Sequence, residues 1–134
     1  MKTIFELKTK IPYDPDTFET VRKAATDLLA NAKKENATQA IVLYSASGKT
    51  YRKIIENACS EDKKAEKELL AELKAAADTE IRYVLCMWQD HNIDIPSFAF
   101  RRMLSESDPK NQDALLFVTT KEGIAVIKAS STMK

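Results

Sequence analysis

The amino-acid sequence predicts an α/β fold, an open and mostly parallel β-sheet with helices on both of its faces. Two short, nearly all-apolar runs at Ala40–Tyr44 and Ile81–Trp88 are typical of strands that are buried on both faces of a parallel sheet. Amphipathic helical stretches alternate with these runs, which is the order of βαβ units. The length of 134 residues suits one domain, and we expect residues 1–134 to form it.

The N-terminal part predicts a strand followed by a long helix. Thr3–Ile11 mixes apolar and charged residues in an imperfect strand pattern. Asp14 suits the N-cap of a helix, Pro15 suits its first position, and Asn36 is a plausible end. The apolar face of this helix consists of Phe18, Val21, Ala25, Leu28, Leu29 and Ala32, which follow one another at helical spacing.

The middle of the chain predicts a loop and two helices after the strand at Ala40–Tyr44. We expect Thr50–Cys59 to be helical and Ser60 to cap a second helix. The loop Ser45–Lys49 runs into Gly-Lys-Thr, as a phosphate-binding loop does, but the glycine that this motif needs five residues earlier is Leu43. We therefore interpret the loop as a strand-to-helix turn. The second helix has one apolar face, made by Ala65, Leu69, Leu73 and Ala76.

The last forty residues allow two interpretations. Phe98–Leu104 suits either a strand or a helical turn. Asp108-Pro109 repeats the N-cap signature, and Gly123 stands where a glycine would end a helix. Ala114–Thr120 has the propensity of a strand, and Ile124–Ile127 is a final strand. A hairpin of these two apolar runs is the competing interpretation.

The charge balance excludes several classes of partner. Lys and Arg number 21 and Asp and Glu number 20, so the net charge is +1. This balance argues against binding driven by the charge of nucleic acid or of an anionic membrane. Apolar runs are all shorter than the roughly 20 residues that span a bilayer, and the start is too charged for a signal peptide. With only two cysteines, we expect a cytoplasmic protein without disulfide bonds.

Metal ligands are scarce in this sequence. His91 is the only histidine, and a paired spacing such as C-x-x-C does not occur. We therefore expect neither a metal nor another cofactor. A nucleophilic pair of Cys86 and His91 is conceivable, but their spacing from a strand end into a loop does not force contact.

Cys86 is the candidate catalytic residue. It lies near the carboxyl end of a predicted strand, where ligand and catalytic groups gather in open parallel sheets. A thiolate there would need activation by a helix N-terminus or a nearby cation. The alternative is a buried structural cysteine, since free cysteine is among the most buried residue types. Four candidate pocket residues accompany it: Ser45, Ser47, Trp88 and His91.

The order of segments also resembles a known family. The strand Ile81–Cys86 ends in cysteine, and the chain closes on Lys-Glu-Gly-Ile-Ala-Val-Ile-Lys at Lys121–Lys128. In these features the chain resembles the DsrE/DsrF-like family of sulfur-relay proteins. The resemblance implies a Rossmann-like sheet of about five strands, with Phe98–Leu104 as a strand and a helix over Pro109–Glu122. It also implies homo-oligomers, either trimers or hexamers.

The resemblance implies a function for Cys86. In the sulfur-relay members, the matching cysteine carries a persulfide that passes between proteins. We therefore expect a small cytoplasmic protein that accepts sulfur on Cys86 and passes it on, with a sulfur donor or acceptor protein as partner. The alternative is a non-catalytic oligomeric binding or assembly module of the same fold, in which Cys86 is structural. The sequence leaves open whether the protein is an enzyme.

Overall fold

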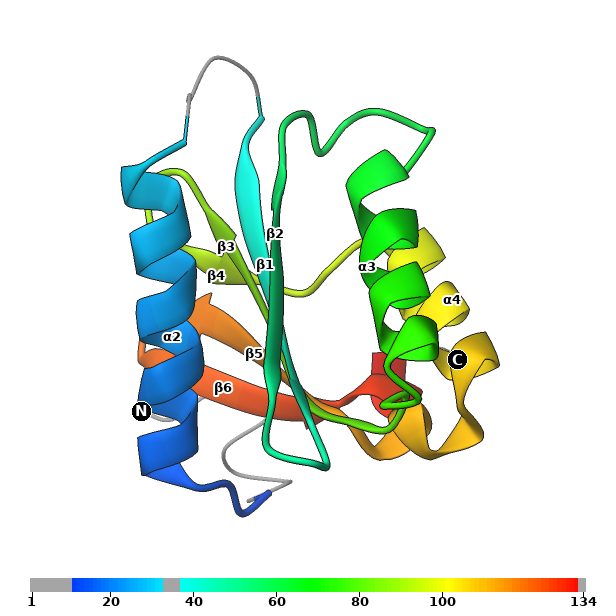
Figure 1. The fold of residues 1–134 in the computed structure, drawn as a ribbon. Coiled ribbons are helices and arrows are strands. Elements are labelled where there is room, and N and C mark those ends of the chain that lie inside the picture. The colour runs from blue at the N-terminus through cyan, green and yellow to red at the C-terminus, as the bar shows by residue number, and fades with distance from the viewer. Residues whose placement is uncertain (1–10, 33–36, 133–134) are drawn as a thin grey trace.

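The structure, a computed structural model, describes residues 11–32 and 37–132. In this part of the chain six strands form one sheet, and three α-helices lie against it (Figure 1). The strands are β1 (Gln39–Ser45), β2 (Thr50–Ile55), β3 (Ile81–Trp88), β4 (Ile93–Asp94), β5 (Leu115–Thr120) and β6 (Gly123–Lys128). The helices are α2 (Pro15–Ala30), α3 (Lys64–Ala75) and α4 (Phe98–Ser107), with short 3₁₀ helices η1 (Pro109–Asp113) and η2 (Ala129–Thr132). Two expectations fall largely outside the described residues. They are the strand at Thr3–Ile11, of which only Ile11 is described, and the helix end at Asn36.

The sheet is mixed, with the order β2-β1-β3-β5-β6 and β4 paired to β3. Only β3 and β5 pair in parallel among the described strands, and the other pairs are antiparallel. The prediction of an α/β fold is therefore confirmed, whereas the prediction of a mostly parallel sheet is wrong. The apolar β1 and β3 do lie buried on both faces, because helices cover each face of the sheet. Such burial is compatible with antiparallel as well as parallel pairing.

Helices cover both faces of the sheet, as predicted. Figure 1 shows α2 on one face, and α3 and α4 side by side on the other. Successive residues of β1 alternate between the two faces, so Ala40 and Val42 pack under α2 while Ile41 and Leu43 pack under α3 and α4. Cys86 of β3 lies in the α3–α4 layer.

The first helix follows its sequence pattern closely. Asp14 stands at the N-cap of α2 in an extended conformation, and Pro15 occupies the first turn. The buried face consists of Phe18, Val21, Ala24, Ala25 and Leu29. The helix ends at Ala30, with Asn31 as its C-cap.

The segment after β1 is a hairpin and not the predicted strand-to-helix turn. The Ser45 backbone N–H donates a hydrogen bond of 2.9 Å to the Lys49 carbonyl oxygen across the turn, and Gly48 provides its positive φ of 89°. Thr50–Ile55 then forms β2, antiparallel to β1, so the helix predicted for Thr50–Cys59 is wrong. Its β-branched and aromatic residues favour a strand. The Gly-Lys-Thr run therefore lies in a hairpin, where it has no helix N-terminus to bind an anion.

The C-terminal part resolves the two interpretations. Phe98–Ser107 is the helix α4, so the strand implied for Phe98–Leu104 is wrong. Leu115–Thr120 is β5, and the long helix implied over Pro109–Glu122 is reduced to the 3₁₀ helix η1. β5 and β6 form the hairpin that was the competing interpretation.

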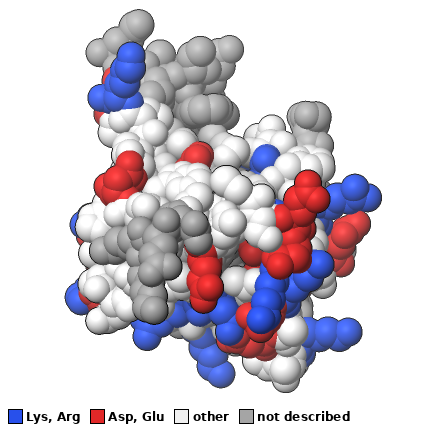
Figure 2. All heavy atoms as spheres, turned by 90° about the horizontal axis from the view of Figure 1, so that it is seen from above, with Lys and Arg blue, Asp and Glu red and all other residues white. Residues whose placement is uncertain are grey.

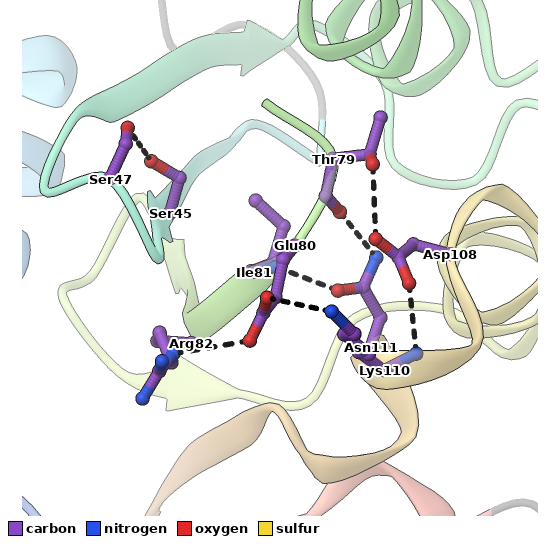
Figure 3. Close-up of polar contacts among 9 residues, drawn as sticks. All are labelled: Ser45, Ser47, Thr79, Glu80, Ile81, Arg82, Asp108, Lys110 and Asn111. Atoms are coloured by element: carbon purple, nitrogen blue, oxygen red, sulfur yellow. Dashed lines mark hydrogen bonds and ion pairs between the residues drawn. The ribbon is translucent and has the colours of Figure 1, made fainter. Parts of the chain in front are cut away.

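A buried asparagine joins η1 to the start of β3. Asn111 is 0% exposed, and its Oδ1 accepts a hydrogen bond of 2.6 Å from the Ile81 backbone N–H (Figure 3). Its Nδ2 donates to the carbonyl oxygens of Thr79 at 2.9 Å and Leu104 at 3.0 Å. Asp108 adds a second link, since its carboxylate accepts from the Thr79 hydroxyl at 3.0 Å. These contacts fix the end of α4 against the parallel strand pair.

The surface mixes charges of both signs. Figure 2 looks onto the top of Figure 1 and shows acidic and basic side chains beside one another on the side of α3. An ion pair of 2.8 Å links Lys53 of β2 to Glu72 of α3. Within residues 11–32 and 37–132, none of the helices is long and apolar enough to cross a membrane.

Candidate functional site

A pocket of about 300 Å³ opens where β2 ends and α3 begins. Its volume is at the lower end of the range for small-molecule sites, roughly 300–1,000 Å³. Most of its wall comes from one continuous stretch of chain that leaves the edge strand and enters the helix. The lining residues are Ile54, Ile55, Glu56, Asn57, Ser60, Asp62, Lys63, Lys64, Ala65, Glu66 and Glu68.

Glu66 is the most buried charged side chain of this pocket. It lies in the first turn of α3 and is only 4% exposed. Its carboxylate has no hydrogen bond or ion pair to any residue that the structure describes. Since every fully enclosed side-chain oxygen in the described chain has a partner, the oxygens of Glu66 must reach the open space of the pocket. An unpaired carboxylate at such a depth is costly unless a ligand or water satisfies it.

Lys63 provides a positive charge at the same wall. It stands at the N-cap of α3 with a left-handed φ of 51°, a conformation that few non-glycine residues adopt. Its Nζ donates a hydrogen bond of 3.3 Å to the carbonyl oxygen of Ala58, so the side chain turns back toward the loop after β2. The loop is anchored in turn by the Ala58 N–H, which donates to the Ala37 carbonyl at 2.8 Å.

Cys86 lies beneath this region and is fully buried. Its Sγ donates to Oε1 of Gln39 at 3.1 Å. Burial raises the pKa of the Cys86 thiol far above its usual range, and the carboxylates of Asp94 and Glu66 raise this pKa further, whereas Lys63 lowers it. The thiol therefore stays protonated at neutral pH.

Of the predicted pocket residues, Trp88 lies close to Cys86, since its indole nitrogen bonds to Asp94, which stands opposite Cys86 in the β3–β4 pair. The two serines lie elsewhere. Ser45 pairs with Ile81 and Trp88 pairs with Gln39, so Ser45 and Trp88 lie at opposite ends of the β1–β3 pair. Ser47 is exposed in the β1–β2 hairpin. His91 is exposed in the turn between β3 and β4, with a positive φ of 72°.

The two serines instead hold an aspartate. Ser45 and Ser47 donate to Oδ2 of Asp78 at 2.8 and 2.7 Å, and Tyr51 donates to the same oxygen at 2.8 Å. The two serine hydroxyls also lie 2.8 Å apart (Figure 3). At the other end of the sheet, Trp88 donates from its indole nitrogen to Asp94 at 3.3 Å.

Comparison with solved structures identifies the fold. The cytidine deaminase from Mycobacterium leprae aligns with a TM-score of 0.62 and 22% identity, over 87% of this chain and 96% of its own. The cytidine deaminase from Burkholderia pseudomallei aligns with a TM-score of 0.61 and 19% identity, over 84% and 93%. The cytidine deaminase from Mycobacterium tuberculosis aligns with a TM-score of 0.61 and 14% identity, over 89% of this chain and 94% of its own. No protein-family model and no curated protein matches the chain. The chain thus shares the fold of cytidine deaminases.

This result corrects the expected family and function. The resemblance to the DsrE/DsrF-like family is wrong, because the similar structures are cytidine deaminases and the sheet of this chain is mixed. A persulfide relay on Cys86 is wrong with it, as is the alternative of an assembly module of the DsrE/DsrF-like fold. The buried, protonated thiol gives the physical reason, since sulfur exchange needs an accessible thiolate.

The deaminase fold raises the question of a zinc site. Zinc-dependent nucleobase deaminases hold the metal through the signature H-x-E…P-C-x-x-C, with cysteine also found at the first position, and their glutamate carries protons without binding zinc. In this chain α3 opens with Lys64-Ala65-Glu66, and α4 follows Pro96 with Ser97-Phe98-Ala99-Phe100. The glutamate and the proline are present, while the ligand positions hold Lys64, Ser97 and Phe100.

This set of side chains does not fit zinc. Lys64 carries an ammonium, and Phe100 has no donor atom and is buried in the core. The Oγ of Ser97 accepts the Phe100 N–H as the cap of α4. Zinc sites in proteins use thiolate, imidazole and carboxylate ligands. Among residues 11–32 and 37–132, no group of three His, Cys, Asp or Glu side chains lies close enough to hold a metal.

Sequence reasoning missed Glu66, although one signal marked it. Glu66 is three residues before Leu69 and seven before Leu73, so it lies on the buried face of α3. A charged residue on the apolar face of a helix has a cost that usually reflects a specific role. This break in the apolar pattern is the signal that marks Glu66 in the sequence.

Proposed function

We propose that this protein binds a pyrimidine nucleoside in the pocket between β2 and α3, and that it does not deaminate it. The unpartnered, buried carboxylate of Glu66 at the pocket wall carries the proposal. The similarity to cytidine deaminases supports the choice of ligand class. The pocket volume is compatible with a ligand of this size.

Hydrogen-bond chemistry supports the role of Glu66. An ionised carboxylate only accepts hydrogen bonds, so it selects a ligand that presents N–H groups. The exocyclic amine of cytosine and the ring N–H of uracil are such donors. A hydrogen bond to a charged acceptor contributes about 1.5–3 kcal/mol, which corresponds to roughly 10- to 150-fold in affinity.

The absence of turnover in this proposal follows from the donor set. Deamination of cytosine needs a water molecule that the metal activates to attack the ring carbon. Lys64, Ser97 and Phe100 do not supply the ligands for that metal. Without the metal, the Glu66 carboxylate can accept either a proton or a hydrogen bond. We assign it the role of accepting a hydrogen bond from the ligand.

Calorimetric titration tests the proposal. Wild-type protein is titrated with cytidine and uridine, with adenosine as a purine control, and Glu66→Gln is compared because it keeps the shape but replaces an acceptor oxygen by a donor. We expect binding of at least one pyrimidine nucleoside and a loss of at least tenfold in Glu66→Gln. Glu122→Gln, in the distant β5–β6 hairpin, should bind like wild type. Equal affinity in Glu66→Gln, or no binding by wild type at millimolar nucleoside, contradicts the proposal.

Product analysis tests the second part of the proposal, that the protein does not deaminate its ligand. Cytidine incubated with the protein should yield no uridine beyond the rate in buffer, as measured by chromatography. Formation of uridine that is lost in Glu66→Gln would show a deaminase and overturn this part alone.

We also propose that the protein is a cytoplasmic homo-oligomer. Phe98, at the start of α4, is 53% exposed and packs under Arg101 at 5.5 Å, which leaves an apolar ring on the surface. Both cysteines are free, as suits a reducing compartment. Light scattering gives the mass, and Phe98→Ser should shift an oligomer toward the monomer. A wild-type protein that is monomeric at high concentration contradicts the oligomer.

A further inference from the structure

The beginnings of α3 and α4 flank the same point of the structure. Figure 1 shows the two helices side by side, and their buried residues Leu69 and Phe100 belong to one core cluster. Asp94, two residues before Pro96, stands opposite Cys86 in the β3–β4 pair. Glu66 and Lys63, at the start of α3, are near enough to Cys86 to shift the pKa of its thiol. The two segments that correspond to the halves of the zinc signature therefore meet above Cys86.

We infer that this meeting point keeps the backbone arrangement of a metal site, here called the frame, but not its ligands. Lys64, Ser97 and Phe100 occupy the three ligand positions of the deaminase fold. The frame itself is present: an acidic residue in the first turn of α3, a proline before α4, and the two helices side by side (Figure 1). Ser97 and Phe100 each have a local structural role. The inference does not rest on nucleoside binding.

Two of the replacing side chains stabilise the fold at positions where metal ligands would lie. Ser97 caps α4 through the 3.2 Å hydrogen bond from the Phe100 N–H, which satisfies one of the free N–H groups of that helix. Phe100 is 0% exposed and fills the core between α4 and the sheet. Lys64 is exposed, and the neighbouring Lys63 places an ammonium at the pocket wall. The positive charge of the wall thus comes from lysine.

Metal analysis separates the lack of zinc ligands in the wild-type protein from the proximity of the three positions. Wild-type protein, purified after incubation with zinc, should hold no stoichiometric metal by inductively coupled plasma mass spectrometry. The triple variant Lys64→Cys/Ser97→Cys/Phe100→Cys should hold about one zinc per chain, because three thiolates and a water complete a tetrahedral site. With cobalt(II), the same variant should give the intense absorption bands of tetrahedral thiolate coordination.

A matched control keeps the number of cysteines and moves one of them. Lys64→Cys/Ser105→Cys/Phe100→Cys places the second new thiol in the last turn of α4, two turns away from the cap, and should not bind zinc at this stoichiometry. Circular dichroism checks that both triple variants fold. Equal zinc binding by the two variants would contradict the assignment of Ser97.

A second variant covers the case in which loss of the buried Phe100 prevents folding. Lys64→Cys/Ser97→Cys leaves the core intact and should bind one phenylarsine oxide, a reagent that bridges two neighbouring thiols, while either single variant should not. A wild-type protein that retains about one zinc per chain overturns the metal-free site. A folded double variant that fails to bind the arsenical overturns the frame. Neither result depends on nucleoside affinity, so the proposed function is judged separately.

Discussion

The Oγ of Ser97 accepts a hydrogen bond of 3.2 Å from the backbone N–H of Phe100. In zinc deaminases the two matching positions hold the cysteines of P-C-x-x-C, where both side chains turn toward the metal. Here the Ser97 side chain accepts the hydrogen bond of the Phe100 backbone N–H, and the Phe100 side chain packs in the core. In this chain the four residues from Ser97 to Phe100 form the cap and first turn of α4.

Ser97→Ala should therefore destabilise the protein by about 1 kcal/mol, the usual cost of losing an N-cap side chain. Urea unfolding followed by circular dichroism measures this free energy of unfolding. Ser105→Ala, the same change inside α4, is the control and should be neutral or slightly stabilising, since alanine has the higher helix propensity. Equal effects of the two changes would show that Ser97 is not a cap.

Asn111→Ala should be among the most damaging single changes. The side chain is fully buried and bonds to the Ile81 N–H and to the carbonyl oxygens of Thr79 and Leu104. Its loss leaves these backbone groups without partners, which costs roughly 3 kcal/mol or more. Asn31→Ala, which removes an exposed amide at the end of α2, should change the stability by less than about 0.5 kcal/mol. Similar urea midpoints for the two variants would contradict the structural role of Asn111.

Asp78 should make the stability depend on pH on the acid side. Burial raises the pKa of its carboxyl, but hydrogen bonds from Ser47, Ser45 and Tyr51 lower it more, so the pKa of Asp78 is below its ordinary value. A carboxyl with a depressed folded pKa adds stability above its unfolded pKa, and this contribution disappears as the pH falls through the folded pKa. The relevant window lies below about pH 4.

Asp78→Asn tests this dependence. The variant should be less stable than wild type at pH 7, and the gap in the free energy of unfolding should narrow below about pH 4. Urea unfolding at neutral and acid pH measures the gap. Asp113→Asn, at an exposed carboxylate, is the control and should show little gap at either pH. A gap for Asp78→Asn that stays constant into acid would contradict the assignment.

The two thiols should react at very different rates. Cys59 is exposed, whereas the Cys86 thiol is buried and has a raised pKa, because of burial first and then because of the carboxylates of Asp94 and Glu66. Iodoacetamide should modify Cys59 in the native protein and Cys86 only after unfolding, as read by mass spectrometry of the two peptides. Cys59→Ser should leave no rapidly reacting thiol. Fast labelling of Cys86 in native protein would contradict the buried site.

Local patterns predicted the elements that depend on local physics. The N-cap and proline located the start of α2, and continuous apolar runs located β1 and β3 within a residue or so of their ends. The pairing direction of β1 was wrong, because burial on both faces reports the helices above and below and not the direction of the neighbour. Phe98–Ser107 and Leu115–Thr120 were ambiguous, since short apolar segments suit either structure until tertiary contacts decide.

The choice of Cys86 as the candidate catalytic residue rested on a different rule. Cys86 was chosen from its place at a strand end, a rule that holds for parallel sheets, and here the strand ends under a helix layer. Glu66 lies on the apolar face of α3, but the helical pattern counts only apolar residues and so does not include it. The pocket itself depends on the loop after β2, which the sequence placed in a helix.

Glu66→Leu should raise the free energy of unfolding by roughly 1 kcal/mol while it removes nucleoside binding. The carboxylate is buried on the face that Leu69 and Leu73 share, with no partner among the described residues, so an apolar side chain of similar size should pack better there. Glu68→Leu, at an exposed position on the same helix, should change the stability by less than about 0.5 kcal/mol. Thermal and urea unfolding give both values. A clear destabilisation by Glu66→Leu would mean that the carboxylate supports the fold, and a role in holding a ligand would then lose its physical basis.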